Sequence, residues 1–112
     1  MDKKYLLYAM QGEKMCFQHV LLNALDLEAD GYEVKVVFEG ASVKLPPMLA
    51  QDNPLYKKAL EKGIIAGVCK ACANSMGVLD EIIKLNLPLL DDMHGHAGVK
   101  PFVKNGYEVL VF

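Results

Sequence analysis

Two cysteines three positions apart are the residues of this sequence best suited to chemistry. Cys69 follows the apolar run 64–68, which is typical of a buried strand, and precedes a short helical segment that ends near Met76. A cysteine between a strand and a helix lies close to unpaired backbone N–H groups and to the positive end of the helix dipole, and both favour the nucleophilic thiolate. We therefore expect Cys69 to be the chemical centre, with Lys70 beside it.

Cys72 and two histidines suggest alternative sites around the same cysteine. The Cys69-x-x-Cys72 spacing matches a redox dithiol, or half of a zinc site completed by His94 and His96. The dithiol motif usually opens the first helix of a differently ordered fold, whereas here it lies past mid-chain. A non-catalytic module that binds a metal or small ligand through these four residues therefore stays as the alternative. The simpler interpretation of these residues is that Cys72 packs in the fold and the two histidines lie on a solvated loop. We expect no cofactor.

Strand-like and helix-like segments alternate along the whole chain. This order implies right-handed βαβ crossovers and one domain, residues 1–112, with a three-layer α/β/α fold and a five-stranded, mostly parallel sheet. The run 40–47 is predicted to be a loop because Pro46 and Pro47 disfavour regular structure. Strands are predicted at 4–10, 32–38, 64–68, 87–90 and 107–112, and helices at 14–29, 54–62, 69–76, 78–83 and, weakly, 96–104, where Pro101 interrupts the pattern.

The carboxyl ends of the predicted strands locate the candidate site. In open α/β sheets, ligands bind outside these ends. The segments that follow strands there include 11–14, the Cys69–Cys72 stretch and the loop 91–96 with its two histidines. Cys16 lies just beyond the first of these segments, inside an apolar helix, and we expect it to pack as a small hydrophobic residue.

Composition excludes several classes of protein. The net charge is −2, arginine is absent and the 12 lysines are scattered, so there is no basic surface for nucleic acid. No apolar run approaches the roughly 18 residues of a membrane span, and the N-terminus does not read as a signal peptide. Three cysteines, an odd number, argue against a secreted disulfide framework. We expect a cytoplasmic protein with no membrane partner.

The predicted first helix, 14–29, is apolar over an unusually wide arc. Its polar residues form one narrow stripe made of His19, Asn23, Asp26 and Asp30. Packing against a sheet needs a narrower apolar face, so we expect a second copy of the chain to cover the remainder. The alternative is that the segment containing Pro46, Pro47 and Met48 folds over this surface within one chain.

The segment from Val68 to Val78, Val-Cys-Lys-Ala-Cys-Ala-Asn-Ser-Met-Gly-Val, resembles the DsrE/DsrF-like family of small sulfur-relay proteins. The matching positions are Cys69, Ala71, Ala73, Gly77 and Val78, whereas Cys72 stands where members commonly have alanine. The resemblance implies a sulfurtransferase-type carrier whose Cys69 takes up sulfur as a persulfide and passes it from a donor protein to an acceptor protein. It also implies a homo-oligomer, a trimer or a hexamer.

Overall fold

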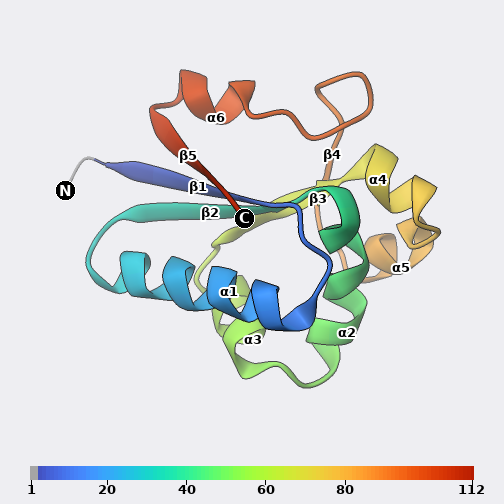
Figure 1. The fold of residues 1–112 in the computed structure, drawn as a ribbon, viewed down its shortest axis with the longest axis horizontal. Coiled ribbons are helices and arrows are strands. Elements are labelled where there is room, and N and C mark those ends of the chain that lie inside the picture. Colours follow the sequence, from blue (N-terminus) through green and yellow to red (C-terminus); the bar gives the residue numbers. More distant parts are fainter. Residues whose placement is uncertain (1–2) are drawn as a thin grey trace.

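A five-stranded sheet with all strands parallel organises the chain (Figure 1). The computed structural model describes residues 3–112. The strand order is β4-β3-β2-β1-β5, so the N-terminal strand lies inside the sheet. The predicted α/β fold is confirmed, and the sheet is entirely rather than mostly parallel. The strands are β1 (Lys4–Ala9), β2 (Glu33–Phe38), β3 (Ile65–Cys69), β4 (Leu89–Leu90) and β5 (Tyr107–Val111).

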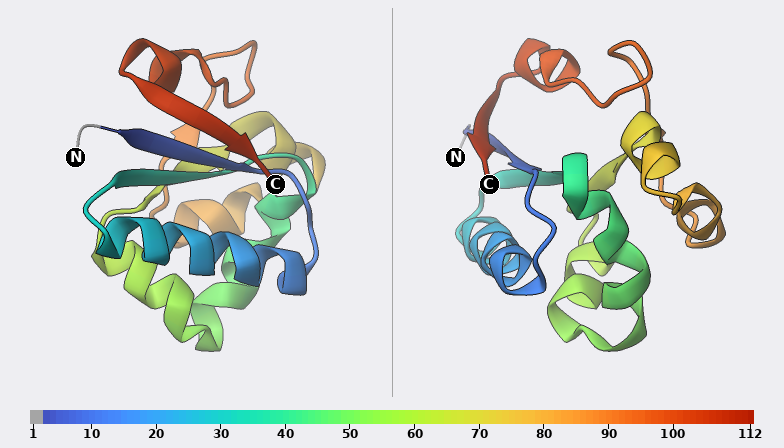
Figure 2. Two further views of the ribbon diagram at one scale, coloured as in Figure 1. Left: turned by 60° about the vertical axis from the view of Figure 1, so that its left-hand side comes forward. Right: turned by 45° about the vertical axis from the view of Figure 1, so that its right-hand side comes forward.

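Helices cover both faces of the sheet. The helices α1, α2 and α3 lie on one face and α6 lies on the other, while α4 and α5 pack at the β4 edge (Figure 2). Consecutive residues Leu6 and Leu7 of β1 point to opposite faces, and both are fully buried. The helices are α1 (Lys14–Ala29), α2 (Leu45–Asp52), α3 (Pro54–Glu61), α4 (Lys70–Ser75), α5 (Leu79–Lys84) and α6 (Lys100–Lys104), with a 3-10 helix, η1 (Gly40–Lys44).

The prediction of a loop over 40–47 was wrong. The structure places η1 there, followed directly by α2. Pro46 and Pro47 stand in the first turn of α2, where a backbone N–H has no helical partner to lose. Pro101 likewise starts α6 instead of interrupting a longer helix.

Aromatic packing fixes the carboxyl end of β2. The rings of Phe17 on α1 and Phe38 on β2 stack with centroids 4.7 Å apart, and Tyr56 on α3 meets Phe38 edge to face at 6.4 Å. All three side chains are almost completely buried. Because Phe38 is the last residue of β2, this packing also determines where the next residue, Glu39, lies.

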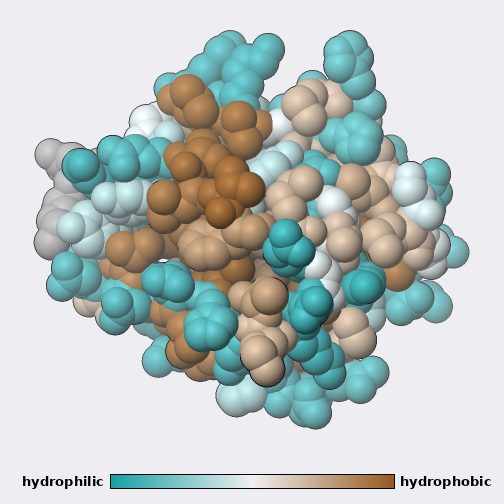
Figure 3. Space-filling model, in the orientation of Figure 1, coloured by the Kyte–Doolittle hydropathy of each residue, from teal (hydrophilic) through white to brown (hydrophobic). Residues whose placement is uncertain are grey.

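The exposed side of α1 carries the apolar residues that the sheet does not cover. Met15 is 76% exposed and Leu22 is 46% exposed, and α2 leaves both in solvent. Cys16, which we expected to be packed, is exposed as well. A second apolar area lies over β5 and α6, where Val111 is 68% exposed (Figure 3). No helix within residues 3–112 has both the length and the apolar character to cross a membrane.

Candidate functional site

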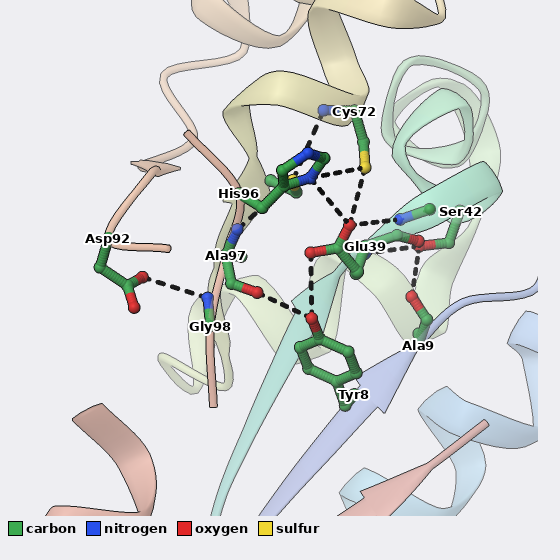
Figure 4. A network of polar contacts seen from close by, with 11 residues as sticks. Tyr8, Ala9, Glu39, Ser42, Cys72, Asp92, His96, Ala97 and Gly98 are labelled. Carbon is green, nitrogen blue, oxygen red and sulfur yellow. Dashed lines mark hydrogen bonds and ion pairs between the residues drawn. The ribbon is translucent and has the colours of Figure 1, made fainter. Parts of the chain in front are cut away.

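Four side chains that could bind a metal or catalyse a reaction meet at the carboxyl ends of the central strands (Figure 4). Glu39 follows β2, Cys69 ends β3, Cys72 lies on α4, and His96 lies in the loop after β4. One side-chain donor atom from each residue lies within 4.8 Å of the others. The structure therefore brings together three residues predicted from sequence and adds Glu39.

Cys69 lies at the junction of β3 and α4 and is completely buried. Its Sγ atom accepts hydrogen bonds from the backbone N–H groups of Cys72 and Ala97, both at 3.4 Å. The first of these bonds caps the N-terminus of α4, as expected for a residue between strand and helix. The Nδ1 atom of His96 lies 3.4 Å from the same sulfur. The sulfur of Cys69 thus accepts two backbone hydrogen bonds and contacts one imidazole nitrogen.

Glu39 is the charged residue at the centre of the site, and only 5% of it is exposed. Its Oε1 atom accepts hydrogen bonds from the Cys72 thiol at 2.7 Å and from the Gly40 N–H at 2.9 Å. Burial by itself would raise the pKa of this carboxyl group, but hydrogen bonds from Cys72, Gly40, Cys69 and Tyr8 outweigh burial and lower it. Glu39 is therefore an ionised acceptor in this site.

Cys72 differs from Cys69 in its hydrogen bonding, because its thiol donates. Burial, with the hydrogen bond to Glu39 as the second cause, raises the pKa of Cys72 to about 12. Its Sγ atom also lies 3.5 Å from Nδ1 of His96. Cys72 is only partly buried, so it lies on the side of the site nearer to solvent.

The loop that carries His96 is held by backbone hydrogen bonds. The Ala71 N–H donates to the Gly95 carbonyl oxygen at 2.9 Å, and Met93 pairs with His96 in an antiparallel bridge. The neighbouring histidine, His94, has a positive φ of 50° and is exposed, outside the cluster of four. Of the two histidines predicted for the site, only His96 reaches the cysteines.

Lys70 follows Cys69 in sequence, but its side chain pairs with an acidic residue outside the cluster. Its ammonium nitrogen is 4.0 Å from Asp91 Oδ2, and its side chain is 52% exposed. The described ion pairs link no lysine to Glu39. The structure therefore leaves Lys70 on the rim of the site.

Two hydroxyl groups, those of Tyr8 and Ser42, hold Glu39 in place (Figure 4). The Tyr8 hydroxyl lies 3.0 Å from Glu39 Oε2 and 2.7 Å from the Ala97 carbonyl oxygen, and burial raises its pKa. Ser42 Oγ accepts the Glu39 N–H at 3.0 Å and donates to the Ala9 carbonyl oxygen at 2.7 Å. These bonds link β1 to the residue after β2 and to the loop after β4.

The fold and this cluster together define a parallel α/β protein with a glutamate–cysteine–histidine site. The chain is 34% identical over 96 residues to the uncharacterized protein MJ0733 of Methanocaldococcus jannaschii, an alignment that covers 82% of this chain and 76% of that one. It is also 30% identical over 57 residues to an uncharacterized protein of Archaeoglobus fulgidus, covering 51% of this chain and 93% of the relative. No family model and no solved structure matches the chain. The protein belongs to the same family as MJ0733.

Proposed function

We propose that this protein is a cytoplasmic sulfur-relay protein that carries a persulfide on Cys69 and transfers the sulfur to a partner protein. The observation that supports this role is the environment of the Cys69 sulfur, which accepts two backbone N–H bonds and contacts the His96 imidazole. N–H donors stabilise an anionic sulfur, whether it is a thiolate or a perthiolate. The resemblance of the segment 68–78 to DsrE/DsrF-like proteins points to the same chemistry.

The transfer proceeds by thiolate exchange without net oxidation. The Cys69 thiolate attacks the terminal sulfur of a donor persulfide, a new S–S bond forms on Cys69, and the donor leaves as its own thiolate. The proton released from Cys69 passes to Nδ1 of His96, which lies 3.4 Å away, and is returned to the departing thiolate. An acceptor thiolate then repeats the attack on the Cys69 persulfide.

Cys72 provides a second exit for the bound sulfur. Its Sγ atom is within 4.8 Å of that of Cys69, and attack on the inner sulfur of the persulfide forms a Cys69–Cys72 disulfide and releases hydrogen sulfide. The S–S bond of the persulfide breaks as the new one forms, so electrons balance. An external dithiol then restores both thiols. A reducing compartment such as the cytoplasm provides this reductant.

Access to Cys69 runs past Cys72 and His96. The Cys69 side chain is fully buried, whereas the His96 side chain is 44% exposed. In this proposal the imidazole takes the Cys69 proton and then rotates outward to admit the donor persulfide, and the same opening admits the acceptor thiolate.

Intact mass spectrometry after incubation with a cysteine desulfurase and cysteine tests the proposal directly. The expected result is one added sulfur atom on the metal-free wild-type protein, and none on Cys69→Ser. Cys16→Ser is the matched control, since Cys16 is exposed on α1, outside the cluster, and it should load like the wild type. Unloaded wild-type protein, or equal loading of Cys69→Ser, would contradict sulfur relay through Cys69.

A further inference from the structure

We infer that Glu39, Cys69, Cys72 and His96 form a binding site for a single zinc-class divalent cation. This metal site is independent of sulfur transfer, because it depends only on the positions of four donor atoms. One alternative from the sequence is a metal bound by the two cysteines with His94 and His96. The structure replaces His94 with Glu39, which comes from a different strand end.

The separations between His96 Nδ1 and the other three donor atoms are close to those around a tetrahedral metal. Zinc bonds of about 2.0–2.3 Å imply ligand-to-ligand distances of about 3.3–3.8 Å in a tetrahedron, the shortest between nitrogen and oxygen ligands and the longest between two sulfurs. Nδ1 of His96 lies 3.4 Å from Cys69 Sγ, 3.5 Å from Cys72 Sγ and 3.8 Å from Glu39 Oε1. The two nitrogen–sulfur separations therefore fit without adjustment, whereas the nitrogen–oxygen separation must shorten by about 0.4 Å to match a nitrogen and an oxygen ligand of one zinc ion.

The separation between Cys72 Sγ and Glu39 Oε1 is shorter than a bound cation would allow. Cys72 Sγ and Glu39 Oε1 are 2.7 Å apart because the thiol proton lies between them. A cation replaces that proton, since thiolate is the form that binds metals. The two atoms then separate by about 0.9 Å to reach tetrahedral spacing. Cys72 is only partly buried, so its side chain has room to make this movement.

The convergence on His96 is not explained by hydrogen bonding alone. A neutral imidazole nitrogen carries either one proton or one lone pair, so it can make one good hydrogen bond. Nδ1 nevertheless has three polar neighbours, from Glu39, Cys69 and Cys72. One cation between the four atoms would satisfy all of them at once.

Charge points in the same direction. Glu39 is buried, the sequence has no arginine, and no described lysine pairs with this carboxylate. A buried carboxylate is costly unless a cation or strong donors compensate it. The Cys72 thiol and the Gly40 N–H already donate to Oε1, and a divalent ion there would take the place of the thiol proton and balance the two thiolates.

The types of donor atom select the class of metal. Two sulfurs, one imidazole nitrogen and one carboxylate oxygen suit a borderline-soft ion such as zinc or cobalt, whereas magnesium and calcium prefer oxygen ligands alone. The surrounding bonds also resemble an outer shell of a metal site. Tyr8 holds Glu39 Oε2 and leaves Oε1 facing the cluster, and the Ala97 N–H donates to the Cys69 sulfur.

Titration of the reduced, metal-free protein with Co²⁺ tests this site. The expected result is one Co²⁺ per chain, with the visible absorption of tetrahedral cobalt and a near-ultraviolet thiolate-to-cobalt band, both lost when Zn²⁺ displaces cobalt. Cys69→Ser, Cys72→Ser and Glu39→Gln should each weaken binding by more than about 100-fold, since even outer-shell changes cost 10–100-fold. Circular dichroism identifies any variant that does not fold. Glutamine has nearly the shape of glutamate, so Glu39→Gln tests the ligand set even if a cysteine variant fails to fold.

Two control variants separate this ligand set from the one expected from sequence. Cys16→Ser and His94→Ala leave the four donor atoms in place and should bind cobalt as the wild type does. The inference is overturned if wild-type protein binds no stoichiometric cobalt, if Glu39→Gln binds like wild type, or if His94→Ala abolishes the tetrahedral spectrum. These titrations contain no sulfur donor, and persulfide loading is measured with metal removed, so either proposal can fail alone.

Discussion

The Sγ atom of Cys69 lies 3.4 Å from Nδ1 of His96, although 27 positions separate the two residues in the chain. β3 ends at Cys69, and β4, its neighbour in the sheet, leads into the loop that carries His96. Parallel pairing of these two strands therefore brings a nucleophilic sulfur next to a base or a second ligand. This contact is common to both proposals, and the residues that support it should control both activities.

Tyr8→Phe should destabilise the fold and loosen the site. The hydroxyl is within hydrogen-bond distance of Glu39 Oε2 and the Ala97 carbonyl oxygen, so its removal leaves two polar groups without this partner. We expect a loss of about 1–2 kcal/mol in the free energy of unfolding. Urea denaturation measures it, with Tyr5→Phe as the control, since the ring of Tyr5 packs edge to face on Tyr32. An unchanged midpoint for Tyr8→Phe would show that these bonds contribute nothing.

Tyr56 should make the protein lose stability at alkaline pH. Burial raises the pKa of Tyr56 to about 12, above the ordinary value of 10.0, because the charged form is disfavoured inside the fold. The raised pKa means that stability is full below pH 10 and declines as pH rises toward 12, by roughly 2 kcal/mol. Tyr56→Phe should reduce this loss between pH 10 and 12. Denaturation midpoints measured at about pH 8, 10, 11 and 12 compare the two proteins across this range.

Other tyrosines contribute to the same alkaline loss in both proteins. The pKa values of Tyr8 and Tyr107 are also raised, with burial as the largest cause. Tyr56→Phe is therefore expected to flatten the pH dependence only in part. A variant curve that falls as steeply as that of the wild type would contradict the assignment to Tyr56.

Most of the fold could be predicted from sequence because its signals are periodic. β-branched and apolar runs marked the five strands, and glycines after the helices marked their ends, as Gly31 does with a positive φ after α1. The proline pair Pro46-Pro47 led to the wrong prediction of a loop over 40–47. Proline breaks the interior of a helix but fits its first turn, where these two residues lie. Sequence pattern alone does not distinguish these positions when the helix boundary is unknown.

The site was predictable only in part, because loops direct side chains in ways that spacing does not reveal. The rule that ligands bind at the carboxyl ends of strands selected Cys69, Cys72 and His96. The same rule could have selected Glu39, which directly follows β2. Choosing His96 over His94 depends on the turn formed by the positive φ of His94 and on the Met93–His96 bridge, and both are tertiary features.

The exposed apolar side of α1 predicts a homo-oligomer. Met15 and Leu22 are seven positions apart, so they share one face of the helix, and both are exposed in the single chain. Light scattering at micromolar concentration should give a multiple of the 12.4 kDa chain mass, as a trimer or a hexamer. Leu22→Lys should reduce the mass, whereas Ile83→Lys, on exposed α5 at the other end of the sheet, should not. A mass of one chain for the wild type would disprove assembly. If Val111→Lys dissociated the oligomer and Leu22→Lys did not, the interface would lie on β5 instead of α1.

Zinc should block persulfide loading, because metal and sulfur compete for the same atom. The Cys69 sulfur is a ligand in the proposed metal site and the nucleophile in the proposed relay, and a zinc-bound thiolate has its reactive electron pair in the metal bond. Zinc-saturated protein is therefore exposed to a cysteine desulfurase and cysteine. It should gain less than about a tenth of the sulfur that metal-free protein gains, because zinc at many times its dissociation constant occupies nearly every site. Adding a chelator should restore loading, and intact mass spectrometry reports both states.

The control is Glu39→Gln, which retains Cys69 but binds zinc weakly, so the same zinc concentration should leave its loading almost unchanged. Loading of zinc-saturated wild type at the metal-free level would mean that the metal and the persulfide do not share Cys69.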